Sequence, residues 1–372
     1  MEGDRISRVV ELEGTGAESA RAFWIAPALV DLQVNGFGGW DINSPDCTSG
    51  HVREVTRALW KAGVAYYCPT VTTGPGWRLI RSLQSIAGAC RQDPATARAV
   101  VGIHLEGPYI SPEDGPRGAH ALADVRPPDW GEFLALQEAA EGGIRIVTLA
   151  PELPNAIPFI EKLASEGIVV ALGHTGADSA QIAAAVAAGA TLSTHLGNGA
   201  HALLPRHPNY LWDQLACDEL WASIIPDGHH LPPAVVKTIL RAKGVDRTLL
   251  VSDAVHLAGL VSGEYSFLGH PVELTPEGRV QLRGTPYLAG SALRLVEGLG
   301  NVVAFAGVSL VEAVQMTTRN PRRLLGIPAE EHDLSPGNPA DLLLLTGDPA
   351  AGSLSLAFTV VGGEVAYLAS GG

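Results

Sequence analysis

Four polar residues stand near the ends of four apolar runs in the sequence. Glu106 ends the run VVGIHLE, His174 follows VVALG, His195 follows ATLST, and Asp253 follows LLVS. If these runs are parallel strands of one barrel, their carboxyl ends open onto the same face of the molecule. The sequence therefore predicts that two carboxylates and two imidazoles converge at one barrel mouth.

These residue types suit metal-assisted hydrolysis. Catalytic zinc commonly takes three protein ligands of the His₂Glu type, and Glu106, His174 and His195 supply that set while the fourth position is left to water. Asp253 then remains free to act as general base toward the water and as general acid toward a departing nitrogen. A single histidine at a strand end is more often an ordinary hydrogen-bonded residue, but four such residues at strand ends favour a catalytic site.

The elements that must position these residues alternate along the chain as strands and helices, and short apolar runs are followed by amphipathic or alanine-rich stretches. We expect an α/β protein built as a (β/α)8 TIM-type barrel, with an open doubly wound sheet as the alternative. The expected strands are Trp24–Val34, Ala65–Val71, Ala99–Glu106, Ile144–Ala150, Ile168–His174, Ala190–His195, Trp221–Pro226 and Leu249–Asp253. The expected helices include His51–Lys61, Ile157–Gly167, Ser179–Ala188 and Pro232–Lys243.

Three segments break this alternation. Residues 1–24 and 334–372 read as strands joined by turns, and we expect them to form a small β-sandwich domain from both chain ends. The barrel would then occupy residues 25–333. A polar insert at 263–287, which includes the alternating stretch VELTPEGRVQL, predicts a hairpin near the barrel mouth.

The composition excludes several classes of protein. A chain of 372 residues that is 46% hydrophobic can bury a large core, and a net charge of −14 without a basic run argues against a nucleic-acid partner. The amino-terminal residues lack the basic and apolar regions of a secretion signal, and no run is long enough to cross a membrane. We expect a cytoplasmic protein with reduced thiols, because its cysteines are scattered: Cys47, Cys68, Cys90 and Cys217.

The arrangement of motifs resembles the N-acetylglucosamine-6-phosphate deacetylase family of the amidohydrolase superfamily, over nearly the whole chain from about Ala26. The main motifs are PALVDLQVNG at 27–36, HLEGP at 104–108, GHT at 173–175 and STHL at 193–196, the last followed by Asn198. Further matches are Asp227-Gly228 with His230, SDA at 252–254, LAGS at 288–291 and PGNPADLLLL at 336–345. The resemblance implies hydrolysis of the linear amide of an N-acetylated amino sugar, most simply N-acetylglucosamine 6-phosphate, to the amine and acetate. It also implies a homodimer.

The resemblance assigns roles to residues outside the predicted metal set. His230 is expected to act in catalysis by hydrogen-bonding the amide carbonyl, and Arg206 is expected to bind a phosphate. The other residues expected to bind substrate are His120, Asn198, Gly199, Leu288, Ala289 and Gly290. The loops depart from the family pattern, with Asn198-Gly199-Ala200 in place of Asn-Ala-Met, so the sequence supports the reaction class more strongly than the substrate. It leaves open the roles of His201, His207 and His229.

The first strand bears on the number of metal ions. Many amidohydrolases have His-x-His there, whereas this chain has Gln33-Val34-Asn35, and neutral amides are poor zinc ligands. We therefore expect one divalent metal per chain, with Zn²⁺ first and Fe²⁺ or Co²⁺ as alternatives. Gln33, Asn35 and His104 are expected to support the site from behind.

Two other functions remain open from the sequence. One is hydrolysis of a different amide, such as a cyclic imide or an N-acyl amino acid. The other is an inactive sugar-phosphate-binding protein, which the complete set of Glu106, His174, His195 and Asp253 disfavours.

Overall fold

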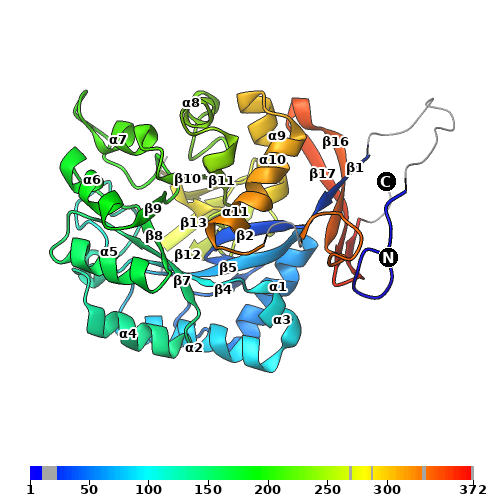
Figure 1. Cartoon of the computed structure of the whole chain (residues 1–372), viewed down its shortest axis with the longest axis horizontal. Helices are drawn as coiled ribbons and strands as arrows, with labels where there is room; N and C mark the ends of the chain where they lie inside the picture. Colours follow the sequence, from blue (N-terminus) through cyan, green and yellow to red (C-terminus); the bar gives the residue numbers. More distant parts are fainter. Residues whose placement is uncertain (11–22, 268–269, 286–287, 329–331, 370–372) are drawn as a thin grey trace.

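A parallel barrel forms the centre of the computed structural model, which describes residues 1–10, 23–267, 270–285, 288–328 and 332–369 (Figure 1). Its eight strands follow one another in space in the order of the sequence, and most of their residues are buried because the strands have packed atoms on both faces. The barrel strands are β2 (Leu29–Val34), β5 (Val64–Thr72), β6 (Ile103–Glu106), β7 (Ile144–Leu149), β8 (Val169–Leu172), β9 (Ala190–Ser193), β10 (Trp221–Ile224) and β11 (Thr248–Leu250). The predicted (β/α)8 class is confirmed.

The barrel closes between β2 and the chain that follows β11. Val34 forms a parallel bridge with Ala254, and the N–H groups of Asn35 and Gly36 both donate to the carbonyl oxygen of Ala254. We call this junction the seam. It lies beside Asp253, so the point of closure is also part of the predicted site.

Helices surround the barrel strands (Figure 1). Several begin at side chains that accept hydrogen bonds from the first turn, such as Thr48 before α1 and Asp178 before α6, where Gln181 completes a capping box. The helices are α1 (Ser49–Lys61), α2 (Gly76–Gln92), α3 (Pro94–Ala99), α4 (Trp130–Ala139), α5 (Ala156–Ser165), α6 (Ser179–Ala187), α7 (Tyr210–Ala216), α8 (Pro233–Lys243), α9 (Leu295–Ala306), α10 (Leu310–Thr317) and α11 (Arg319–Leu324). Short 3₁₀ turns occupy Leu122–Asp124, Val245–Arg247 and Pro349–Ala351.

The two chain ends meet in one antiparallel sheet, which packs beside α9 (Figure 1). The predicted joining of the ends is confirmed, and the regular strands of the described residues there form a single layer. These strands are β1 (Phe23–Pro27), β16 (Leu342–Asp348), β17 (Ser353–Val361) and β18 (Glu364–Leu368). Residues 11–22 and 370–372 of the predicted end domain lie outside the described residues.

The predicted first strand, Trp24–Val34, is wrong as a single element. The chain changes partner at Ala28, whose N–H donates to Asp341, whereas the next N–H, that of Leu29, donates to Gly63. β1 consequently belongs to the terminal sheet and β2 to the barrel. The continuous apolar run conceals this change because it covers both the largely exposed β1 and the buried β2.

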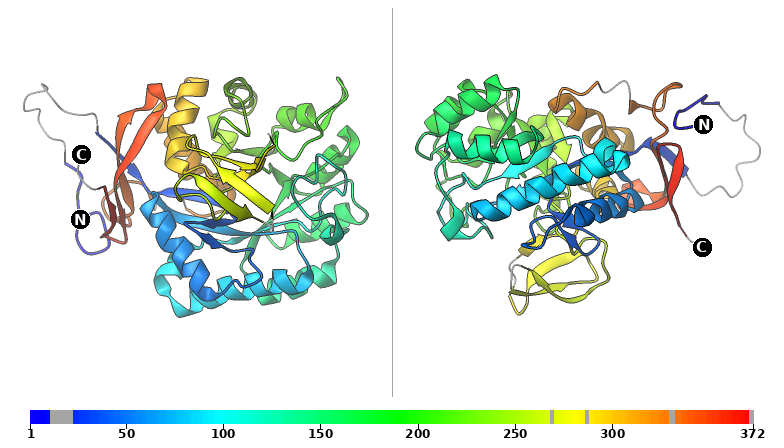
Figure 2. Two further views of the ribbon diagram at one scale, coloured as in Figure 1. Left: turned by 180° about the vertical axis from the view of Figure 1, so that it is seen from behind. Right: turned by 90° about the horizontal axis from the view of Figure 1, so that it is seen from below.

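The insert after β11 is larger than the predicted hairpin. It forms a four-stranded antiparallel sheet that projects from the barrel, as the right-hand view of Figure 2 shows. Its strands are β12 (Gly263–Phe267), β13 (His270–Leu274), β14 (Arg279–Leu282) and β15 (Leu288–Ser291), and the small β3 (Gly36–Phe37) and β4 (Trp40–Asp41) pair separately. Residues 268–269 and 286–287 of the predicted insert lie outside the described residues. A parallel bridge from Ser291 to Ala254 joins this sheet to the seam.

Among the described residues, no helix is both long and apolar enough to cross a bilayer.

Candidate active site

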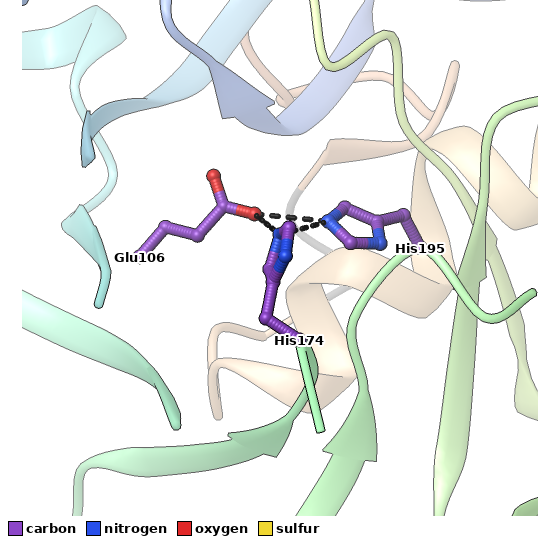
Figure 3. A group of neighbouring side chains, drawn as sticks. All are labelled: Glu106, His174 and His195. Carbon is purple, nitrogen blue, oxygen red and sulfur yellow. Dashed lines mark hydrogen bonds and ion pairs between the residues drawn. The ribbon is translucent and has the colours of Figure 1, made fainter. Parts of the chain in front are cut away.

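Glu106, His174 and His195 converge at the carboxyl ends of their strands (Figure 3). Glu106 Oε1 lies 3.1 Å from His174 Nε2 and 2.9 Å from His195 Nε2, and the two nitrogens lie 3.0 Å apart. All three side chains are buried. The structure thus brings together the three residues that the sequence predicted as metal ligands.

The donor chemistry of this triad fits a divalent cation. His174 Nδ1–H donates to the carbonyl oxygen of Pro116 over 2.7 Å, so Nε2 is the nitrogen of this ring that a metal ion would use. Ligand atoms around a tetrahedral Zn²⁺ with bonds of about 2.0–2.1 Å lie about 3.3 Å apart, close to the spacing here. Burial alone would raise the pKa of Glu106, but the contacts from the two imidazoles hold it well below its usual value. The site therefore favours the ionised carboxylate that a metal needs.

Asp253 lies beside this triad and is held by two amide side chains. Its Oδ1 accepts a 2.7 Å hydrogen bond from Asn35 Nδ2 and a 3.1 Å hydrogen bond from Gln33 Nε2. Gln33 Nε2 also donates to Glu106 Oε1 over 3.0 Å, so one amide contacts both carboxylates. Burial, and then the charge of Glu106, raise the pKa of Asp253 to about 6. A carboxyl group with such a pKa can both accept and return a proton near neutrality.

A hydrogen-bonded row lies behind the triad. His104 Nδ1–H donates to the carbonyl oxygen of Leu32, so His104 Nε2 accepts from the hydroxyl of Thr148 over 2.7 Å. Thr148 and Thr194 share a further hydrogen bond of 2.7 Å. Burial lowers the pKa of His104 to about 4, so this ring is neutral. It donates one hydrogen bond from Nδ1 and accepts one at Nε2.

Three of the site residues have backbone angles that non-glycine residues rarely adopt. The φ angles are +52° at His174, +27° at His195 and +49° at Asp253, all at or near the left-handed region. Each residue follows the end of its strand, where the chain turns sharply out of the barrel. Such conformations cluster at functional sites because the surrounding fold must hold them in place.

His230 is oriented by Asp227. Its Nδ1 lies 2.6 Å from Asp227 Oδ2, and Asp227 Oδ1 accepts the backbone N–H groups of His229 and His230. His230 is close enough to Asp253 for its positive charge to lower the pKa of that carboxyl group. The remaining nitrogen of His230 is thus available for a group bound at the mouth.

The residues expected to bind substrate lie in loops that follow barrel strands and in strand β15. His120 packs its ring edge-on against His174 at 4.5 Å, and Asn198 donates to the carbonyl oxygen of His195. Gly199 fits tightly, since an added Cβ would lie 2.8 Å from His174 Nδ1. Arg206 is exposed on the loop before α7. The 288–290 segment forms β15, where an added Cβ at Gly290 would meet Val255, just beyond Asp253.

Sequence reasoning missed several supporting groups. Pro116 acts through its carbonyl oxygen, which no residue type reveals, and Thr148 and Thr194 read only as ordinary strand residues. Glu152 accepts from Thr175 Oγ1 over 2.6 Å and from the N–H of Gly176 over 2.7 Å, and so anchors the chain after His174. Glu152 follows the end of β7. Its position after a barrel strand is the sequence feature that could have marked it as a site residue.

The barrel, the carboxylate–imidazole triad and the adjacent aspartate are features of metal-dependent hydrolases. The model of the Amidohydrolase family matches residues 24–372, and the chain belongs to that family.

Proteins similar to this chain within the family include deacetylases of amino sugar phosphates. The N-acetylglucosamine-6-phosphate deacetylase of Bacillus subtilis is 30% identical over 346 residues, which cover 92% of this chain and 85% of the relative. The N-acetylgalactosamine-6-phosphate deacetylase of Escherichia coli O157:H7 is 32% identical and covers 86% of this chain and 83% of its own. The crystal structure of the N-acetyl-D-glucosamine-6-phosphate deacetylase of Mycobacterium smegmatis superposes with a TM-score of 0.85 at 30% identity, over 98% of this chain and 94% of that one. The resemblance drawn from the sequence motifs is confirmed.

Proposed function

We propose that this protein is a metal-dependent hydrolase that removes the acetyl group from an N-acetylated amino sugar 6-phosphate. The observation that carries the proposal is the buried triad of Glu106, His174 and His195 with Asp253 beside it. Relatives at 30–32% identity over most of the chain, all named as deacetylases of such sugars, support it.

The residues of this chain divide the reaction between them. Glu106, His174 and His195 would hold one divalent ion, for which we propose Zn²⁺; when bound, it supplies a Lewis acid that activates water and polarises the amide carbonyl. Asp253 accepts the proton of the attacking water and later donates it to the amide nitrogen as the C–N bond breaks. The products are acetate and the free amine.

Two further groups orient these steps. His230 donates from Nε2 to the carbonyl oxygen as negative charge develops there, and Asp227 holds the other ring nitrogen. Gln33 and Asn35 hold Asp253 Oδ1, which leaves Oδ2 for proton transfer. Gln33 and Asn35 are neutral amides, which supports one metal ion rather than two.

Arg206 is the proposed phosphate ligand. Its guanidinium is exposed on the loop between Asn198 and α7, where a charge-assisted contact to a phosphate would distinguish a phosphorylated sugar from a neutral one. His120, Asn198, Gly199 and the 288–290 segment complete the proposed sugar site.

The test is acetate release from N-acetylglucosamine 6-phosphate, N-acetylgalactosamine 6-phosphate and the two unphosphorylated sugars. We expect turnover of at least one phosphorylated sugar and a far lower kcat/KM for its neutral counterpart. The comparison of gluco and galacto forms is needed because relatives of both names lie at similar identity. Absence of acetate release from all four sugars, with metal bound, would reject the proposal.

We also propose a cytoplasmic homodimer. Four free thiols suit a reducing compartment. Leu203, in the loop that carries Arg206, is 90% exposed and Trp212 of α7 is 53% exposed, and a second subunit would cover these apolar side chains. Sedimentation of the purified protein tests the oligomeric state. We further propose that residues 1–24 and 334–372 form one domain and residues 25–333 the other.

A further inference from the structure

Glu113, His201 and Tyr210 form a chain of hydrogen bonds between two loops at the barrel mouth. His201 Nε2 lies 2.8 Å from Glu113 Oε2, and His201 Nδ1 lies 3.0 Å from the hydroxyl oxygen of Tyr210. The backbone N–H of His201 donates to the same hydroxyl oxygen over 2.8 Å. Because both ring nitrogens have protein partners, neither is free to bind a sugar hydroxyl. In this structure, His201 therefore uses both ring nitrogens to join two parts of the protein.

The loop that Glu113 anchors carries the groups that contact His174. The N–H of Arg117 donates to the carbonyl oxygen of Glu113 over 2.9 Å, which closes a turn around Pro116. Within this turn, the carbonyl oxygen of Pro116 accepts the 2.7 Å hydrogen bond from His174 Nδ1. Holding Glu113 therefore restrains the acceptor that orients the imidazole of His174.

The two loops are in direct contact, so their positions depend on each other. A Cβ added at Gly115 would lie 2.8 Å from His201 Cα and 3.0 Å from the carbonyl oxygen of Ala200. Tyr210 is buried at the start of α7 and provides a fixed anchor for His201. The side chain of Glu113, in contrast, is 64% exposed. Among the described residues, its carboxylate contacts His201. The His201 ring is the link between the fixed helix and the exposed end of the other loop.

We propose that His201 is a positioning residue for the metal site: by joining Glu113 to Tyr210, it holds the Pro116 carbonyl against His174 Nδ1. This inference rests on the proposed metal site, but not on the identity of the substrate. Groups that hydrogen-bond to a ligating histidine commonly change metal affinity by about 10–100-fold when they are removed. His201 acts one step further out, so we expect an effect near the lower end of that range.

The test measures the dissociation constant for Zn²⁺ in the absence of substrate, by competition with a chelator. The variants are His201→Ala, Glu113→Ala, their double mutant and Glu113→Gln, which keeps a carbonyl acceptor for His201 Nε2. Glu161→Ala is the matched control, because it removes an exposed carboxylate on the outer helix α5, whereas Asp114 forms an ion pair with Arg117 in the same turn as Pro116. Thermal unfolding of each metal-free protein reports any general loss of folding.

We expect each single alanine variant to bind Zn²⁺ about tenfold more weakly. The double mutant should be no weaker than either single variant, since both remove the same link. Glu113→Gln should recover most of the affinity, and Glu161→Ala should match the unchanged protein. Equal affinity in all variants, or a loss that follows only the thermal stability of the metal-free protein, would overturn the inference. Failure of the unchanged protein to bind Zn²⁺ would instead overturn the proposed metal site and this inference with it.

Discussion

Asn35 Nδ2 donates a 2.7 Å hydrogen bond to Asp253 Oδ1 across the seam of the barrel. The two residues are 218 positions apart in the sequence, and the contact exists only because the first and last barrel strands meet. The hydrogen bond fixes which carboxylate oxygen of Asp253 faces the protein. The other oxygen is left for proton transfer.

Asp253→Asn should retain the metal and the fold while kcat falls by at least ~100-fold, the lower end of what a positioned acid–base group contributes. In the unchanged enzyme, activity should rise with pH as Asp253 ionises. This acidic limb should lie at or below about pH 6, because a bound cation lowers the pKa further. Kinetics across pH on both proteins check this: the variant should lack the limb. Loss of metal from the variant would make Asp253 a ligand instead.

The chain should bind one divalent ion, and His195→Ala should remove the ion and the activity together. Two remaining ligands hold a metal much less firmly than three. Elemental analysis of both proteins measures the stoichiometry, with His270→Ala as a control on an exposed histidine of β13. Two ions per chain, both needed for turnover, would show that Gln33 and Asn35 take part in a second site.

Gly199→Ala should weaken metal binding and lower kcat. The added Cβ would lie 2.8 Å from His174 Nδ1 and would push the ring away from the Pro116 carbonyl. Gly244→Ala is a suitable control because Gly244 also has a positive φ, +72°, but has open space around its Cβ position. Chelator competition on the two variants separates backbone strain from displacement of His174. Equal effects would attribute the loss to strain alone.

Arg206→Ala should raise KM for a phosphorylated sugar far more than for its neutral counterpart. A hydrogen bond to a charged group contributes roughly 1.5–3 kcal/mol, which corresponds to a factor of about 10 to 150 in KM. Steady-state kinetics with both sugars measure the ratio, and Arg57→Ala on the outer helix α1 provides a control. A similar change for both sugars would exclude Arg206 as the phosphate ligand.

Asp31→Asn should change how the stability of the protein depends on pH. Asp31 is fully buried, and burial raises its pKa in the folded state to about 7, above the value of about 3.9 in an unfolded chain. The protonated side chain therefore stabilises the fold below about pH 4, and this contribution is lost as pH rises toward 7. Urea unfolding at pH 4 to 8 should show a smaller decline for the variant. Parallel curves for the two proteins would contradict this role.

Periodicity and motif order predicted most of what positions the site. The end of β6 was predicted correctly and the ends of β8 and β9 within two residues, because buried parallel strands give uninterrupted apolar runs and polar residues mark where those runs stop. Glu106, His174 and His195 followed from those ends. These three ligand candidates therefore lie at positions that the apolar pattern of the sequence marks clearly.

Contacts made by backbone atoms or across the seam were not predictable in the same way. The carbonyl oxygen of Pro116 carries no residue-specific signal, and the hydrogen bonds of Gln33 to both Glu106 and Asp253 depend on barrel closure. The split of Trp24–Val34 into β1 and β2 depends on which partner offers a carbonyl oxygen, which periodicity does not record.

The seam is also the place where we expect the barrel to open locally. Seven strand pairs of the barrel form ladders of two or more paired residues, three of them with register shifts, whereas β2 meets the chain after β11 through the single Val34–Ala254 bridge and its neighbouring hydrogen bonds. Local opening of a fold is favoured where the fewest bonds must break. Asn35 and Asp253 stand on opposite sides of that junction, so a brief parting of the barrel wall would separate the base from its partner. The enzyme would then be active only while this junction is closed. The backbone amides in the rest of the core would remain protected from hydrogen exchange.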